Sequence, residues 1–301
     1  MALPPRDQPT ARVGRAPMTV GRDRPGPRER QSLAPRSATI TVMIRAAFAA
    51  AKGLKRDFGE VEHLQVSAKG PADFVSRADI MAEKTLRAEL SRTRPEYGFL
   101  GEEGGESKGT GEIGSRNRWI ADPLDGTTNF LHGVPHFAIS LALERDGEII
   151  AGVIYQPISD ELFWAEKGNG AFVDTPNARS RRLRVSGRKI LGQALIGTGI
   201  PMMGRGNHPE YVGKLETVMG KTAGVRRWGA ASLDLAFVAA GRYDAFFEYD
   251  LAQWDVAAGL LMVREAGGQV SDISGKPYEL GGPSILASNT GLHDAMVEAL
   301  G

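Results

Sequence analysis

Trp119–Phe130, with the sequence WIADPLDGTTNF, begins as an apolar run typical of a strand and ends as a polar turn. Pro123 cannot donate a hydrogen bond to a neighbouring strand, so we expect the strand to stop there. Such a turn can bring Asp122 and Asp125 around one point, with the Leu124 carbonyl beside them. Two carboxylates and a carbonyl are hard oxygen ligands, which suit Mg²⁺ or Mn²⁺. The alternative is an ordinary strand-end turn, because Asp, Gly and Thr are common in turns.

Three other acidic positions have the same two interpretations, one functional and one structural. Glu102 lies in a Gly-Glu-Glu-Gly loop after the apolar run Tyr97–Leu100, where a solvated loop is the alternative. Asp255 begins an apolar helix and could be only its N-cap. Asp79 lies early in another predicted helix, where it could simply complement the helix dipole.

The spacing of apolar residues predicts a mixed α/β fold. For the first half we predict two helices followed by a mostly antiparallel meander, with a hairpin at Asp146-Gly147. The second half alternates strands and helices, and we expect a boundary near residues 179–189. The predicted helices are 39–51, 77–90, 210–219, 230–239, 254–266 and 292–300, and the predicted strands are 97–100, 118–121, 137–144, 149–155, 161–165, 194–197, 224–227, 243–247, 269–272 and 285–287.

Residues 109–114 match the dinucleotide-binding pattern G-x-G-x-x-G. That pattern requires a strand before it and a helix after it, so that backbone amides face a pyrophosphate. A polar segment precedes these glycines and a strand-like run follows them. We therefore expect a loop here and no nucleotide site.

Composition limits the classes of function. The 301 residues contain no Cys, which excludes disulfides, thiolate nucleophiles and Cys-based zinc sites. There is no apolar run long enough to span a membrane. The formal net charge is +1, so from the composition we do not expect a nucleic-acid partner. We expect a cytoplasmic protein.

Residues 1–36 differ from the rest of the chain. They contain eight Arg, no Lys, three acidic residues and seven Pro, and few apolar residues. Such a segment cannot bury enough surface to offset its ordering entropy, so we predict a disordered basic arm. A catalytic domain then spans residues 37–301, with halves of approximately 37–185 and 186–301.

Together, the acidic segments resemble the inositol monophosphatase family, in that family's order and spacing. The match runs from about residue 38 to the C-terminus and leaves the arm outside. The matching residues are Lys69–Asp79, Gly101-Glu102-Glu103, Trp119–Phe130 and Trp254–Gly268. The resemblance implies an αβαβα sandwich of the inositol monophosphatase and fructose bisphosphatase type.

The resemblance also implies a site that binds two or three Mg²⁺ ions per subunit. The first ion would be held by Glu102, Asp122 and the Leu124 carbonyl, and the second by Asp122, Asp125 and Asp255. A third would lie near Glu102. Asp79 and Thr127 would orient the attacking water. The implied substrate contacts are Glu102, Leu124, Asp125, Gly126, Thr127, Gly229, Ala230, Ala231, Glu248 and Asp255.

The implied activity is Mg²⁺-dependent hydrolysis of a small phosphate monoester, foremost myo-inositol 1-phosphate, by a homodimer. Metal ions suit this chemistry because they neutralise the phosphate and lower the pKa of bound water without a histidine base. Asn129-Phe130 after Gly126-Thr-Thr resembles the inositol branch more than the nucleotide or histidinol branches. Histidinol phosphate, fructose 1,6-bisphosphate and 3′-phosphoadenosine 5′-phosphate remain alternative substrates. A second alternative is a regulatory protein that binds the transcription machinery and retains the enzyme fold.

Overall fold

The computed structural model describes residues 36–58, 66–70, 73–201 and 206–301. The predicted disordered arm therefore lies outside the described residues, apart from Arg36, and stays a prediction. Within the described part of the chain, no helix is both long enough and apolar enough to cross a membrane.

The larger sheet has the strand order β10-β9-β8-β7-β6-β5-β3-β4 in the described part of the chain. Among its described strands only β3 and β5 pair in parallel, and from β6 to β10 each strand pairs antiparallel with the preceding one, as the meander prediction requires. Asp146 and Gly147 both have positive φ, 52° and 80°, as a tight two-residue hairpin between β6 and β7 needs. The strands are β3 (Gly98–Gly101), β4 (Gly105–Ser107), β5 (Asn117–Asp125), β6 (Ala138–Arg145), β7 (Glu148–Gln156), β8 (Glu161–Glu166), β9 (Gly170–Thr175) and β10 (Ala178–Arg182).

The smaller sheet has the order β12-β11-β13-β15-β14 and mixes parallel and antiparallel pairs. Helices alternate with its strands along the chain, as the sequence predicts for this half. Its strands are β11 (Leu195–Thr198), β12 (Gly224–Arg226), β13 (Ala245–Tyr249), β14 (Gly268–Ser271) and β15 (Ser284–Asn289).

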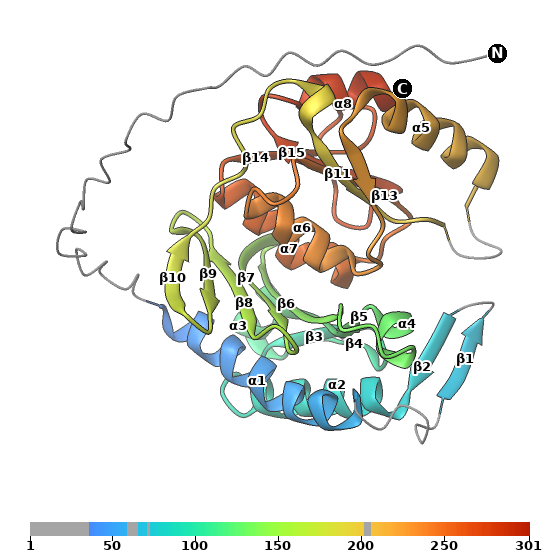
Figure 1. The fold of residues 1–301 in the computed structure, drawn as a ribbon. Coiled ribbons are helices and arrows are strands. Elements are labelled where there is room, and N and C mark those ends of the chain that lie inside the picture. The colour runs from blue at the N-terminus through green and yellow to red at the C-terminus, as the bar shows by residue number, and fades with distance from the viewer. Residues whose placement is uncertain (1–35, 59–65, 71–72, 202–205) are drawn as a thin grey trace, which may run out of the picture. The chain divides into compact units, whose positions relative to one another are not determined.

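Helices and sheets stack in five alternating layers, which confirms the αβαβα prediction (Figure 1). A first core lies between α1, α2 and one face of the larger sheet. A second joins the other face of that sheet to α6, α7 and the smaller sheet, and a third lies between the smaller sheet, α5 and α8. The helices are α1 (Ala38–Phe58), α2 (Arg77–Ser91), α5 (His208–Lys221), α6 (Ala231–Ala239), α7 (Gln253–Glu265) and α8 (His293–Leu300).

Several short elements escaped the sequence prediction. The expected loop at residues 109–114 is wrong in part, because Gly111–Arg116 forms the short helix α3. The Thr110 amide donates to the Glu96 carbonyl (2.8 Å), which fixes the chain just before this helix. The other short elements are β1 (Val66–Gly70), β2 (Asp73–Ser76), β4, α4 (Thr127–Leu131) and the 3₁₀ turn η2 (Leu191–Gln193).

The strands β9 and β10 were also missed. β10 has the sequence ARSRR and is mostly exposed, so it lacks the apolar alternation that marks a half-buried strand. It is the last strand of the larger sheet, and β11 opens the smaller one. The division of the domain into halves at about residue 185 stays a prediction.

Gly152 on β7 lies where the larger sheet meets α7. A Cβ at this position would come within 3.0 Å of the Ala258 Cα and carbonyl oxygen, so the backbone of α7 would have to move. We expect Gly152→Ala to lower the free energy of unfolding by about 1–3 kcal/mol, measured by urea denaturation.

Gly213→Ala is the matched control. Gly213 is exposed within α5, with nothing within 4 Å of an added Cβ. Alanine there should raise stability by about 0.5–1 kcal/mol through helix propensity. Equal effects of the two substitutions would show that the close approach at Gly152 is not a packing constraint.

Candidate active site

The prediction that the strand stops at Pro123 is wrong, because β5 continues to Asp125 and accommodates the proline in a bulge. This bulge sets the direction of two carboxylates. Asp122 pairs with Ser140 and Asp125 pairs with Ala138, so three steps along β5 match two steps along β6. Residues three apart in a regular strand point to opposite faces, but one extra residue restores the same face. Ala138 belongs to the core with α6 and α7. Asp122 and Asp125 therefore both face the α6–α7 layer.

The chain then turns sharply at Gly126 into α4. Gly126 has φ 93°, in the left-handed region, and an added Cβ would lie 3.1 Å from the His136 carbonyl oxygen. Thr127 follows, and its hydroxyl lies 3.1 Å from Asp79 Oδ1 and 3.0 Å from the Leu124 carbonyl oxygen. The predicted pair of Asp79 and Thr127 is thus in contact, although the two residues are 48 positions apart in sequence.

Helix α2 presents a second buried carboxylate one turn after Asp79. Glu83 accepts hydrogen bonds from the amides of Glu103 (2.7 Å) and Gly104 (2.9 Å), in the loop that carries Glu102. An added Cβ at Gly101 or Gly104 would lie within 2.5 Å of a Glu83 oxygen. Glu83 therefore fixes the Glu102 loop against α2.

Arg87, a further turn along α2, supports the same loop from its other side. Its guanidinium lies 3.6 Å from Glu83 Oε1, donates to Ser107 Oγ (2.9 Å) and stacks on the Phe99 ring. One face of α2 thus holds both the loop of Glu102 and, through Asp79, the hydroxyl of Thr127.

Asp255 and Asp125 both sit at the starts of helices. Asp255 Oδ2 accepts the Ala252 amide (2.8 Å) in the first turn of α7, so Asp255 does help to cap the helix, but from its third position, because the N-cap residue is Ala252. Asp125 Oδ2 accepts the Ser232 amide (2.8 Å) and the Ser232 hydroxyl at the start of α6. The positive ends of two helices thereby stabilise charge at these positions.

The acidic side chains Glu102, Asp122, Asp125 and Asp255 line one cavity of about 200 Å³. Every residue predicted to bind metal or substrate lines this cavity, and Asp79 is connected to it by its hydrogen bond with Thr127. Asn129 also lines it, and its amide donates to the carbonyls of His136 and Trp228 (both 2.7 Å). The lining residues are Glu102, Asp122, Leu124, Asp125, Gly126, Thr127, Thr128, Asn129, Gly199, Ile200, Pro201, Arg227, Gly229, Ala230, Ala231, Glu248, Tyr249, Asp250, Leu251 and Asp255.

Burial and mutual repulsion raise the pKa values of the carboxyls in this cavity. Burial, followed by the charges of Glu102, Asp125 and Asp255, raises the pKa of Asp122 well above its usual range. Burial and then the Asp125 and Glu102 charges raise the pKa of Asp255 to about 8. Burial together with the Asp255 and Asp125 charges raises the pKa of Glu248 to about 8, against the lowering effect of Arg227.

This donor set fits a hard divalent cation. Crowded buried carboxylates lose free energy through desolvation and repulsion unless a cation compensates them, and oxygen donors suit Mg²⁺. In the described part of the chain, however, no three Asp, Glu, His or Cys side chains are arranged to hold one ion as they stand. Asp122 and Asp125 instead direct oxygens at the Leu124 amide and at Ser232. Each of these bonds occupies one oxygen of its carboxylate, and the second oxygen remains as a donor atom for a cation.

The sequence interpretation missed three residues of the site. Glu83 could have been found from its place four residues after Asp79, on the same helix face. Ser232 directly follows Gly229-Ala230-Ala231, but nothing in its type marks it as a partner of Asp125. The role of Arg227 could not be decided from the sequence, and the structure places it in the cavity wall.

Comparison with known proteins gives a consistent result. A profile described as the inositol monophosphatase family matches residues 36–300. An inositol-1-monophosphatase from Rhizobium meliloti is 58% identical, over 88% of this chain and 97% of that protein. A protein from Pseudomonas aeruginosa named Nus factor SuhB is 44% identical, over 87% of this chain and 95% of that protein. The crystal structure of the extragenic suppressor protein suhB from Bartonella henselae superimposes with a TM-score of 0.83 at 52% identity, covering 88% of this chain and 98% of that one.

Glu83→Gln tests the anchoring of the Glu102 loop. The amide group of Gln would oppose one of the two backbone N–H donors, leaving that donor buried without an acceptor. We expect a loss of about 2–3 kcal/mol in the free energy of unfolding, and faster hydrogen exchange at the amides of Glu103 and Gly104.

Glu89→Gln, on the same helix, provides the comparison. Glu89 pairs with Arg92 at the surface, so its neutralisation should cost no more than about 0.5 kcal/mol. Unchanged exchange at Glu103 and Gly104 in Glu83→Gln would show that Glu83 does not anchor the loop.

Proposed function

This chain belongs to the inositol monophosphatase family and is a phosphoric monoester hydrolase, and on that premise we propose that it hydrolyses myo-inositol 1-phosphate with Mg²⁺. The observation that carries the proposal is the convergence of Glu102, Asp122, Asp125 and Asp255 on one cavity, beside the Asp79–Thr127 pair. Homodimerisation and a cytoplasmic location belong to the same proposal and rest on the family resemblance.

Glu102, Asp122, the Leu124 carbonyl, Asp125 and Asp255 would hold the Mg²⁺ ions. When bound, Mg²⁺ lowers the pKa of water and neutralises charge on the phosphate and the leaving oxygen. The residues themselves supply the negative charge that attracts the ions. Backbone amides hold these carboxylates in place: the start of α6 holds Asp125, the start of α7 holds Asp255, and the Leu124 amide holds Asp122.

Asp79 and Thr127 would orient the attacking water. The Thr127 hydroxyl has a single proton and two oxygen neighbours, so it makes one strong donor bond at a time. A charged Asp79 is the stronger acceptor. Donation to Asp79 leaves the hydroxyl oxygen free to accept a proton of the water and leaves the Leu124 carbonyl available as a ligand.

The opposite wall of the cavity would bind the hydroxyl-bearing part of the substrate. Glu248 and Arg227 lie there together, beside Gly229, Ala230 and Ala231. A buried acid and a guanidinium offer acceptors and donors to vicinal hydroxyls.

A second candidate function comes from the relatives named Nus factor SuhB. For this chain, it would be a regulatory role with the transcription machinery in which the enzyme fold is retained. Every carboxylate of the site is present, so the regulatory role would accompany the hydrolase and not replace it.

A phosphate-release assay tests the substrate. With Mg²⁺, we expect the highest kcat/KM for inositol 1-phosphate among four compounds, the others being histidinol phosphate, fructose 1,6-bisphosphate and 3′-phosphoadenosine 5′-phosphate. Asp125→Asn removes one charge from the proposed site and should lower phosphate release at least about 100-fold.

Asp294→Asn is the matched control for this substitution. Asp294 is exposed on α8 and lies outside the cavity, so its neutralisation should leave the rate unchanged. A preference for the nucleotide would overturn the choice of substrate. Full activity of Asp125→Asn would overturn the site.

The raised pKa values predict how pH and Mg²⁺ act on stability. The folded-state pKa values of Asp255 and Glu248 are about 8, whereas unfolded carboxyls titrate near 4. Between these values the folded protein holds protons that the unfolded chain has lost. In EDTA, stability should therefore fall as pH rises from about 5 to about 8, by up to about 1.4 kcal/mol per pH unit for each group.

Mg²⁺ favours the charged carboxylates, so its stabilising effect should grow over the same pH range. Thermal unfolding in EDTA and in Mg²⁺, at intervals of pH, measures both trends. A melting temperature that Mg²⁺ leaves unchanged at pH 8 would contradict the proposed metal site.

A further inference from the structure

Positive charge is concentrated in one segment of the described structure. Residues 175–190 contain six cations and no acidic residue. All six side chains are exposed, and we call them the basic strip: Arg179, Arg181, Arg182, Arg184, Arg188 and Lys189. Residues 1–36 carry a formal charge of +5. Since the whole chain carries +1, residues 37–301 carry −4, and they would carry −10 without the six cations of the basic strip. The near-neutral total thus conceals a strong separation of charge.

Most cations of the strip have no carboxylate partner among the described residues, whereas several exposed cations elsewhere do. Arg92, Arg116, Lys167 and Arg242 each form an ion pair with a nearby acid. Among the described residues, Arg188 is the only member of the strip with such a pair, at 3.2 Å from Asp244. The remaining five charges face solvent, where a polyanion could replace their counterions.

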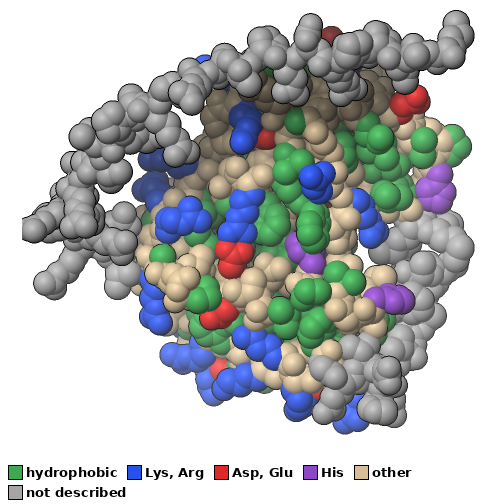
Figure 2. All heavy atoms as spheres, in the orientation of Figure 1, with side chains coloured by type: hydrophobic (Ala, Val, Ile, Leu, Met, Phe, Trp, Pro, Cys, Tyr) green, Lys and Arg blue, Asp and Glu red, His purple; other side chains and the backbone are tan. Residues whose placement is uncertain are grey.

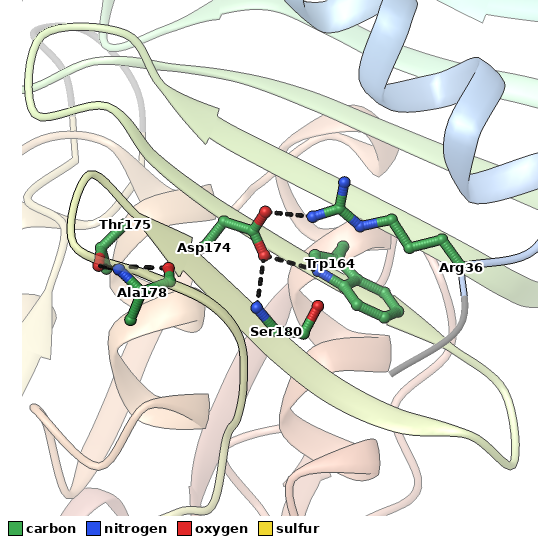
Figure 3. A network of polar contacts seen from close by, with 6 residues as sticks. All are labelled: Arg36, Trp164, Asp174, Thr175, Ala178 and Ser180. Atoms are coloured by element: carbon green, nitrogen blue, oxygen red, sulfur yellow. Dashed lines mark hydrogen bonds and ion pairs between the residues drawn. The ribbon is translucent and has the colours of Figure 1, made fainter. Parts of the chain in front are cut away.

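Asp174, a carboxylate on the neighbouring strand β9, already interacts with other groups. Asp174 forms an ion pair with Arg36 and accepts the Ser180 amide (2.9 Å), with the Trp164 indole at 3.5 Å (Figure 3). Arg36, which precedes α1, thereby reaches the edge of the sheet formed by β9 and β10. The sequence joined to it, residues 1–35, contains seven further Arg.

The strip also occupies a sheet edge. β10 is the last strand of the larger sheet, so one side of its backbone has no strand partner among the described residues. Figure 2 shows Lys and Arg side chains gathered on the left of the view, over the region of β9, β10 and the segment after them.

Protection of the sheet edge against aggregation explains one or two charges but not six cations in a segment without acids. β10 has a bulge between Ala178 and Arg181 and a positive φ at Ser180, which disfavours the addition of a peptide strand. Ile190 is the one large exposed apolar side chain within the segment, which is too little for insertion into a membrane. Five of the six cations are Arg, whose planar fork matches phosphate oxygens.

We propose that the basic strip binds the phosphodiester backbone of a single-stranded nucleic acid. None of its residues lines the catalytic cavity, so binding is separate from hydrolysis. The interaction is electrostatic and independent of base sequence, since phosphate contacts position a strand without reading it.

Fluorescence anisotropy of a labelled oligouridine of about 20 nucleotides, with the full-length chain at about 50 to 200 mM KCl, tests the proposal. The strip variant is Arg179→Gln, Arg181→Gln and Arg182→Gln combined. The control variant is Arg92→Gln, Arg116→Gln and Lys167→Gln, which removes the same charge from paired positions.

The strip variant should bind at least about 10-fold more weakly, and the slope of log K against log[KCl] should fall by about 2, near 0.7 per lost phosphate contact. The control variant should stay within about twofold of the unaltered chain, and both variants should keep full phosphate release. Equal weakening in both variants, or no binding of the unaltered chain at about 50 mM KCl, would overturn the proposal. Tighter, strip-dependent binding to anionic phosphatidylglycerol vesicles or to polyglutamate would also overturn it, in favour of a membrane or an acidic protein.

Discussion

Negative charge buried between two sheets is the constraint on which this structure depends. Asp122 and Asp125 on β5, Glu248 on β13 and Asp255 on α7 share one cavity, where burial and repulsion oppose their ionisation. Folding tolerates this only because helix starts and backbone amides provide donors to these groups. The same unfavourable arrangement is what gives the site its affinity for cations, since a divalent ion removes the repulsion that folding has created.

Regular apolar spacing predicted most of the buried helices and strands, whereas their arrangement in five layers followed from the family resemblance. α1, α2, β6 and β7 have such spacing, and the motif around Asp122 made the family recognisable. The edge strand β10 could not be predicted in this way, because its side chains face solvent and its pairing is decided by the neighbouring strand. Likewise, the sequence indicated which carboxylates share the site but not that Glu83 holds the loop of Glu102, since that contact depends on how α2 packs.

Two parts of the site that act on different groups are joined through one helix. Asp79 contacts Thr127, and Glu83, one turn later, holds the amides after Glu102. A small rotation of α2 would therefore displace the water-orienting pair and a proposed metal ligand together. Its burial against the larger sheet, through Ala82, Leu86 and Leu90, opposes such a rotation.

The bulge at the end of β5 makes the number of residues between Asp122 and Asp125 as restrictive as their identity. Along a regular strand, side chains at odd and even positions point to opposite faces of the sheet, and the bulge exchanges the two faces once. Loss of one residue at Pro123 or Leu124 would remove the bulge and place Asp122 and Asp125 on opposite faces of the sheet. One of the two carboxylates would then point into the apolar core beneath α1 and α2. Homologues can therefore vary this segment by substitution, whereas a change in its length would need a compensating change in β6.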